Sequence, residues 1–136
     1  METNKRNLKG SPSRDTFKQW HKIGIPKEFY ACDIDLCLVT KFPQPGIVAF
    51  IDFKVRHERG REPISFSEVI VYNALLEGGY LVYIIYGDYE TVEPLDIYQY
   101  IGGDYHPNPP VYQLRLIAQH INKGQYIMWE NQLRKA

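Results

Sequence analysis

The sequence has few cysteines and no long hydrophobic run, and both shortages exclude classes of protein. Its 136 residues include only two cysteines, Cys32 and Cys37. They lie on one predicted strand at an odd separation, so their side chains point to opposite faces and no disulfide between them is expected. No apolar run approaches the length of a membrane span, and the polar N-terminus lacks the apolar region of a signal peptide. We therefore expect a protein of the reducing cytoplasm that does not enter a membrane.

An excess of charge of one sign is also missing. Lysine and arginine together number 16, as do aspartate and glutamate, so the formal net charge is zero, which is not typical of a strong nucleic-acid binder. No cysteine or histidine cluster has zinc spacing, and no glycine-rich phosphate-binding motif is present. The composition is that of an ordinary globular chain. The length fits a single domain over residues 14–136, preceded by a flexible arm at residues 1–13.

Hydrophobic periodicity and turn residues predict the elements of the N-terminal half. We expect a short helix at residues 15–21 and two strands at residues 29–39 and 47–55, with a proline-containing loop between the strands. A polar loop follows at residues 56–63. The sequence Ser65-x-x-Glu68 then forms a capping-box pattern, which predicts a helix that ends near Gly78.

The C-terminal half begins with residues 80–86, whose aromatic and β-branched composition predicts a buried strand. Because this strand follows a strand and a helix, we expect a right-handed crossover and a parallel neighbour. Residues 95–101 predict an edge strand. Apolar residues at helical spacing predict an amphipathic helix over residues 111–121 and a last short helix over residues 126–133. The expected fold is therefore α/β, with a mixed central sheet flanked by helices and extra helices at the C-terminus.

Charged residues interrupt the two strands that would otherwise be buried. Asp33 and Asp35 lie two apart on the first strand, and Asp52 and Lys54 lie two apart on the second. Residues two apart on a strand share a face, so a hairpin of these strands brings all four to one face. A buried carboxylate without a partner is costly. Clustered titratable groups at strand ends therefore indicate a functional site, although a structural ion pair between Lys54 and an aspartate explains part of the pattern.

This arrangement resembles the PD-(D/E)xK nuclease superfamily over roughly residues 28–88, with Asp35 as the first acid and Asp52-Phe53-Lys54 as the second motif. The resemblance implies a restriction-endonuclease-like core and a magnesium- or manganese-dependent endonuclease. In it, Asp35 and Asp52 bind the metal, the carbonyl of Phe53 adds a ligand, and Lys54 assists the attacking water. Asp33 remains an alternative or additional metal ligand. The resemblance favours DNA over RNA as substrate and allows a homodimer.

Two further acids have candidate roles. Members of the superfamily often carry an upstream acid that helps to bind metal, and Glu28 is the candidate here, with a solvated loop residue as the alternative. The helix after the second motif often places a polar residue at the site, which makes Glu68 a candidate catalytic residue. Its role as a helix cap is a sufficient explanation by itself. Tyr72, one turn later, is more simply explained by packing.

A basic cluster follows Lys54 directly and is the candidate surface for nucleic-acid phosphates. It consists of Arg56, His57, Arg59 and Arg61. Its alternative is a solvated loop. The alternative function for the whole chain is a catalytically inactive nuclease-like module for nucleic-acid binding or assembly, which the zero net charge and the lack of a proline before the aspartates both allow.

Overall fold

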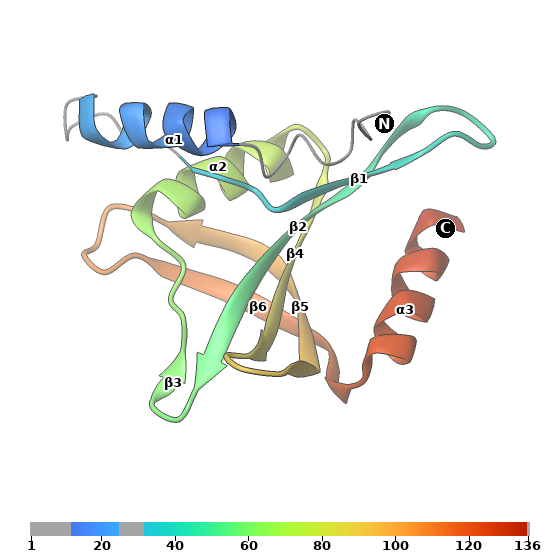
Figure 1. The fold of residues 1–136 in the computed structure, drawn as a ribbon. Helices are drawn as coiled ribbons and strands as arrows, with labels where there is room; N and C mark the ends of the chain where they lie inside the picture. The colour runs from blue at the N-terminus through green and yellow to red at the C-terminus, as the bar shows by residue number, and fades with distance from the viewer. Residues whose placement is uncertain (1–11, 25–31, 136) are drawn as a thin grey trace. The chain divides into compact units, whose positions relative to one another are not determined.

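The computed structural model describes residues 12–24 and 32–135, and the chain divides into two compact units, Met1–Ala31 and Cys32–Ala136. The described part of the first unit is one helix, α1 (Pro12–Gly24) (Figure 1). A helix was predicted at residues 15–21, and the observed one begins earlier, with proline in its first turn, where the missing N–H has no cost. The remainder of the predicted arm, residues 1–11, lies outside the described residues.

The second unit contains a six-stranded mixed sheet with two helices. The strand order is β1-β2-β4-β5-β6, and the short β3 pairs only with β2. The strands are β1 (Leu36–Thr40), β2 (Gly46–His57), β3 (Gly60–Arg61), β4 (Leu81–Asp88), β5 (Val92–Asp104) and β6 (Val111–Ile121). The helices are α2 (Phe66–Glu77) and α3 (Lys123–Lys135).

The connection from β2 through α2 to β4 confirms the predicted strand-helix-strand unit. β2 and β4 are parallel, with Asp52 opposite Ile84 and Lys54 opposite Tyr86, whereas β1 pairs antiparallel with β2 as a hairpin. The predicted capping box is also present. The Ser65 side chain accepts the N–H of Glu68, and the Glu68 carboxylate accepts the N–H of Ser65. These bonds satisfy donors that the first turn of α2 leaves unpaired.

Each face of the sheet carries its own hydrophobic cluster. On one face, α2 contributes Val69 and Tyr72 to a cluster with Val82, Ile84, Tyr86 and Tyr100 of the sheet. On the other face, Tyr126, Trp129 and Leu133 of α3 pack against Ala49, Ile51, Tyr83, Ile85 and Ile97. Consecutive residues of β2 therefore alternate between the two helices. Even-numbered residues from Phe50 to Lys54 face α2.

Residues 111–121 form the strand β6, so the prediction of an amphipathic helix there was wrong. The register explains the misleading periodicity. Tyr98 pairs with Leu116 and Ile97 pairs with Ala118, so Ile117 is an extra residue in β6. Such a bulge interrupts the alternation of inward and outward side chains. The apolar residues then recur at intervals of three and one, which is also the spacing of a helical face. Only one of the two expected C-terminal helices, α3, is present among the described residues.

Three other boundaries differ from the predictions. β5 is an interior strand rather than an edge, because β6 covers its second side. The segment predicted as a loop after residue 55 is a hairpin, since β2 continues to His57 and turns into β3. The first strand begins at Leu36, and residues 29–31 lie outside the described part of the chain.

No described helix is both long and apolar enough to cross a bilayer.

The close approach of Gly87 to Phe53 gives a prediction for stability. A Cβ added at Gly87 would lie 2.6 Å from the Phe53 ring and 2.7 Å from the Val92 carbonyl oxygen. Overpacking of this kind is destabilising, so Gly87→Ala should lower the free energy of unfolding by about 2 kcal/mol in urea denaturation. Gly46→Ala is the control, because no atom lies within 4 Å of an added Cβ there. Equal effects of the two substitutions would contradict the packing argument.

Candidate functional site

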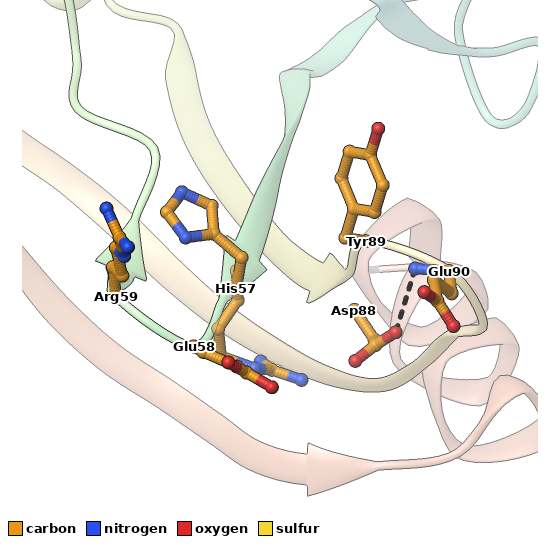
Figure 2. Close-up of a pocket in the computed structure, with 7 residues that line it drawn as sticks. His57, Glu58, Arg59, Asp88, Tyr89 and Glu90 are labelled. Carbon is orange, nitrogen blue, oxygen red and sulfur yellow. Dashed lines mark hydrogen bonds between the residues drawn. The ribbon is translucent and has the colours of Figure 1, made fainter.

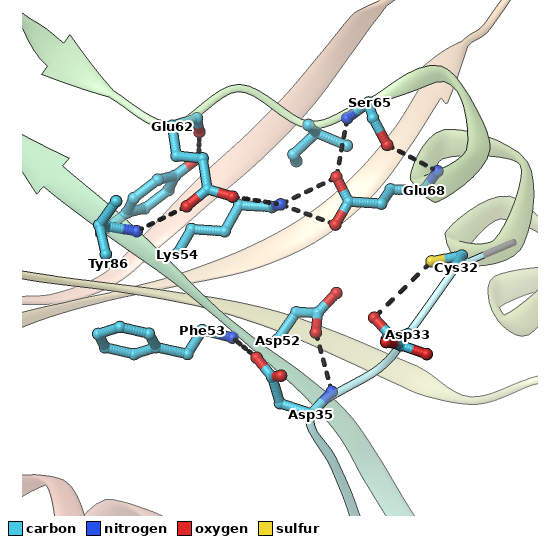
Figure 3. A network of polar contacts seen from close by, with 12 residues as sticks. Cys32, Asp33, Asp35, Asp52, Phe53, Lys54, Glu62, Ser65, Glu68 and Tyr86 are labelled. Atoms are coloured by element: carbon cyan, nitrogen blue, oxygen red, sulfur yellow. Dashed lines mark hydrogen bonds and ion pairs between the residues drawn. The ribbon is translucent and has the colours of Figure 1, made fainter. Parts of the chain in front are cut away.

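Backbone hydrogen bonds hold Asp35 and Asp52 together where β1 begins. The register pairs Leu36 with Ile51, so Asp35 comes beside Asp52 on the neighbouring strand. The N–H of Asp35 donates to Oδ1 of Asp52 at 3.0 Å, and the N–H of Phe53 donates to Oδ2 of Asp35 at 2.7 Å (Figure 3). The structure therefore brings together the two acids that the sequence suggested as metal ligands.

Asp52 is a buried carboxylate beneath α2. Only 3% of its surface is exposed, and its second oxygen, Oδ2, accepts a hydrogen bond from the hydroxyl of Tyr72. Burial raises the pKa of Asp52. Hydrogen bonds from Tyr72 and Asp35 oppose this shift, while the nearby charges of Asp35 and Glu68 add to it. Burial and the Asp52 carboxylate likewise raise the pKa of Tyr72, so its hydroxyl remains a donor.

Lys54 lies on the same face of β2 and forms an ion pair with α2. Its Nζ donates to both carboxylate oxygens of Glu68, at 2.9 and 2.7 Å. The pair is largely buried, with side-chain exposures of 4% for Lys54 and 16% for Glu68. Burial alone would raise the pKa of Glu68, but the hydrogen bonds from Lys54 and Ser65 outweigh it and lower that pKa. Glu68 thus acts as the helix cap and as the partner of Lys54 at once.

A second carboxylate, that of Glu62, reaches Lys54 from the chain after β3. Its Oε2 lies 3.6 Å from Nζ of Lys54, and its Oε1 accepts the N–H of Val55 at 3.1 Å. Phe53 and Val55 both direct their N–H groups to the outer edge of β2, beyond the end of β1, and a carboxylate accepts each one. Because the N–H and C=O of a strand residue point to the same neighbour, the Phe53 carbonyl faces that edge too.

Cys32 is an additional group near these charges. Burial and the charges of Glu68 and Asp52 raise the pKa of its thiol to about 11. The side chain of Asp33 is exposed just before Asp35, and its carbonyl accepts the thiol of Cys32 at 3.9 Å. Glu28 lies outside the described residues.

The donor set fits a hard divalent cation. No three His, Cys, Asp or Glu side chains in the described part of the chain group together as a metal site. Magnesium, however, usually takes only one or two protein carboxylates and fills the remaining positions with water. Asp35 and Asp52 supply two, and carboxylates outnumber cations around Lys54. A bound cation would also relieve the cost of burying the charge of Asp52.

The structure separates Arg61 from the other three basic residues after Lys54, which line one hollow. Arg56 is tied to the sheet, because its guanidinium donates to the carboxylate of Asp96 at 2.7 Å and to the Pro94 carbonyl. Arg61 lies over the rings of Tyr86 and Tyr98, at 5.1 and 4.9 Å from their centroids. Arg56 also lines a polar hollow of about 460 Å³ together with His57 and Arg59, and the other residues around this hollow are Glu58, Asp88, Tyr89 and Glu90 (Figure 2).

Comparisons with protein-family models, with curated proteins and with solved structures found no match.

Sequence reasoning missed two residues of the site. Tyr72 was assigned to packing, yet its hydroxyl contacts Asp52 and lies 3.3 Å from Glu68. Its position four residues after Glu68, on the same face of the helix, was the available signal. No pattern in the sequence indicated a place for Glu62 at the site. Its contact depends on the β2–β3 hairpin, which was not predicted.

The buried ion pair gives a stability prediction. Lys54→Met should lower the free energy of unfolding by about 3 kcal/mol, because it leaves the Glu68 carboxylate without its main cation. Adding Glu68→Gln should recover part of this loss. The double variant should therefore lose less stability than the sum of the losses of the two single variants. Urea denaturation measures all three variants. Lys41→Met, at an exposed loop position, should change stability by less than about 0.5 kcal/mol.

The raised pKa of Asp52 gives a pH prediction. The folded chain holds a proton on this carboxyl more readily than the unfolded chain does, so the ionised form lowers stability at neutral pH. Asp52→Asn removes that cost and should raise the free energy of unfolding at pH 7 by about 1 kcal/mol. Its advantage should shrink as the pH falls toward the ordinary aspartate value of 3.8. Thermal unfolding from pH 4 to 8 tests this, and an advantage that grows on acidification would refute it.

Proposed function

We propose that the chain is a divalent-metal-dependent endonuclease that hydrolyses phosphodiester bonds. The observation that carries this proposal is the placement of Asp35, Asp52 and Lys54. Asp35 and Asp52 are held together at one edge of β2, and two residues further along that strand the buried Lys54 ammonium is paired with two more acids, Glu62 and Glu68. Stability alone does not require such a concentration of charge, because buried ion pairs rarely improve on apolar packing.

The candidate metal ligands are the carboxylates of Asp35 and Asp52 and the carbonyl of Phe53. A divalent cation held there would lower the pKa of a bound water and neutralise charge on a phosphate. Asp33 and Glu28 remain candidates for additional ligands. The support for magnesium or manganese is the chemistry of the donors, which are oxygen atoms of hard, anionic groups.

The protein groups have separate tasks in this proposal. The Lys54 ammonium donates hydrogen bonds to the attacking water and to phosphate oxygens as negative charge develops on them. Glu68 positions Lys54, and its low pKa keeps it anionic so that Lys54 stays protonated. The Tyr72 hydroxyl holds the buried oxygen of Asp52, which leaves less freedom to the carboxylate that binds metal.

The fold supports the same proposal. A β1–β2 hairpin, a crossover through α2 and the parallel strand β4 occur in the order expected for a restriction-endonuclease-like core. The superfamily resemblance favours DNA as substrate. Arg61, His57 and Arg59 are the candidate phosphate contacts, whereas Arg56 is already occupied by Asp96. Two free cysteines agree with a reducing cytoplasm. A homodimer remains compatible with this activity.

One observation favours the alternative of a catalytically inactive nuclease-like module. Protein groups already bind both oxygens of Asp52, and Glu68 holds Lys54 through two hydrogen bonds. A network with its partners already in place can be a structural ion-pair cluster. Metal binding and cleavage distinguish the two readings.

The test combines calorimetric titration of manganese with plasmid cleavage. Wild type should bind the metal and nick plasmid DNA. Asp52→Asn should weaken metal binding at least about tenfold and abolish detectable cleavage. At a temperature where the less stable Lys54→Met variant is still folded, it should keep metal binding while cleavage falls about a hundredfold, because the positive charge beside the phosphate is lost.

Asp104→Asn is the matched control, since Asp104 is an exposed aspartate that pairs with His106 away from these residues. It should leave binding and cleavage unchanged. Metal binding by wild type without cleavage of DNA or RNA would favour the inactive module. Absence of metal binding in wild type would make the cluster a structural network and remove the proposal.

A further inference from the structure

Glu62 differs from the other carboxylates near Lys54 in its exposure and in the weakness of its contact. Its side chain is 44% exposed and lies 3.6 Å from the lysine nitrogen, whereas Glu68 is 16% exposed and contacts that nitrogen at 2.7 Å. Glu68 also caps α2, while Glu62 follows directly after the two-residue strand β3. Lys54 therefore keeps its main partner if the Glu62 carboxylate moves away.

We propose that the Glu62 carboxylate occupies a phosphate-binding subsite and that an incoming phosphate displaces it. The inference rests on the proposed function in one respect: if the chain is a nuclease, the phosphate that binds here belongs to the sugar-phosphate backbone of the substrate. The subsite is made of the Lys54 ammonium and the N–H of Val55, which are the donors that Glu62 now uses.

These donors suit a phosphate oxygen. Phosphate contacts in nucleic-acid complexes commonly combine lysine or arginine side chains with backbone N–H groups. The Val55 N–H lies on the outer edge of β2, past the end of β1 and opposite the main chain of Glu62, and its acceptor is the half-exposed Glu62 side chain rather than a main-chain carbonyl. A carboxylate and a phosphate offer the same kind of anionic acceptor, so one can replace the other.

Arg61 supplies a further cation at the same place. Its guanidinium lies over the ring of Tyr86, and the hydroxyl of that tyrosine donates to the Glu62 carbonyl at 2.9 Å. One buried side chain therefore supports both Arg61 and Glu62. Stacking on Tyr86 and Tyr98 orders the guanidinium in advance, which lowers the entropic cost of binding a phosphate.

The consequence for affinity follows from the charges. With Glu62 in place, two carboxylates face Lys54, and an approaching phosphate is repelled as well as attracted. Glu62→Gln removes one negative charge but keeps an oxygen that can accept the Val55 N–H. A contact of 3.6 Å to a half-exposed carboxylate is weak for an ion pair and contributes up to about 1 kcal/mol, so phosphate affinity should rise about fivefold.

The experiment is a titration of inorganic phosphate without metal, followed by the amide NMR shifts of Val55 and its neighbours at fixed ionic strength. Glu62→Gln should bind phosphate about fivefold more tightly than wild type. Glu58→Gln removes the same charge from the β2–β3 turn, where Glu58 lines the polar hollow, and should leave the affinity unchanged.

Two arginine variants test the same subsite. Arg61→Gln should weaken phosphate binding in the Glu62→Gln background, whereas Arg134→Gln, with the same loss of charge on α3 at the other face of the sheet, should not. Equal effects of Glu62→Gln and Glu58→Gln would show a general charge effect and overturn the subsite, as would the absence of phosphate binding in every variant.

A second experiment, with DNA as the ligand, tests this inference independently of the proposed function. It also distinguishes binding of a nucleic-acid backbone phosphate from binding of free phosphate. With plasmid DNA, Glu62→Gln should lower KM by a similar factor. Cleavage by wild type with no response of KM or phosphate binding to Glu62→Gln would leave the nuclease proposal standing and remove the subsite. The expected phosphate titration without any cleavage would keep the anion subsite and remove the nuclease proposal.

Discussion

The ion pair between Lys54 and Glu68 is the constraint on which the rest of the site depends. It joins the strand β2 to the first turn of α2, in a place where both side chains are largely buried. An ammonium in such surroundings needs a strong partner, because the cost of desolvation is otherwise uncompensated. The pairing fixes the height of α2 above the sheet. It thereby brings the next turn of the helix, with Tyr72, over Asp52.

The hairpin of β1 and β2 contributes the other half of the site through backbone geometry. β1 is short, so beyond Ile51 the edge of β2 has no partner in β1, and on the β3 side main-chain bonding reaches only to Val55, whose carbonyl accepts the Glu62 N–H. Asp35 and Glu62 supply the missing acceptors with side chains instead of main chain. An exposed strand edge usually invites pairing with another chain. Here acidic side chains accept the free N–H groups of the edge. This disfavours pairing with another strand and leaves the edge accessible to small polar groups.

Much of this arrangement was readable from the sequence, for physical reasons that differ between residues. Asp52 and Lys54 were assigned to one face because strand side chains alternate, and Ser65 and Glu68 marked the start of α2 because that pair satisfies unpaired donors. The strand β6 was misread because Ile117 interrupts its alternation, and a bulge leaves no local signal in the sequence. The contact of Glu62 with Lys54 could not be predicted for a similar reason. It depends on the tight β2–β3 hairpin, which brings Glu62 back beside β2.

The double role of Glu68 has a consequence for how the molecule responds to its surroundings. The same carboxylate accepts hydrogen bonds from Ser65 at the beginning of α2 and from Lys54 in the sheet. A new charge or ion near Lys54 that alters its hydrogen bonds to Glu68 must therefore also alter the hydrogen bond by which Glu68 caps the helix. The stability of the first turn of α2 therefore depends on the charge near Lys54. The rate of hydrogen exchange at the Ser65 amide would follow that charge even when no reaction takes place.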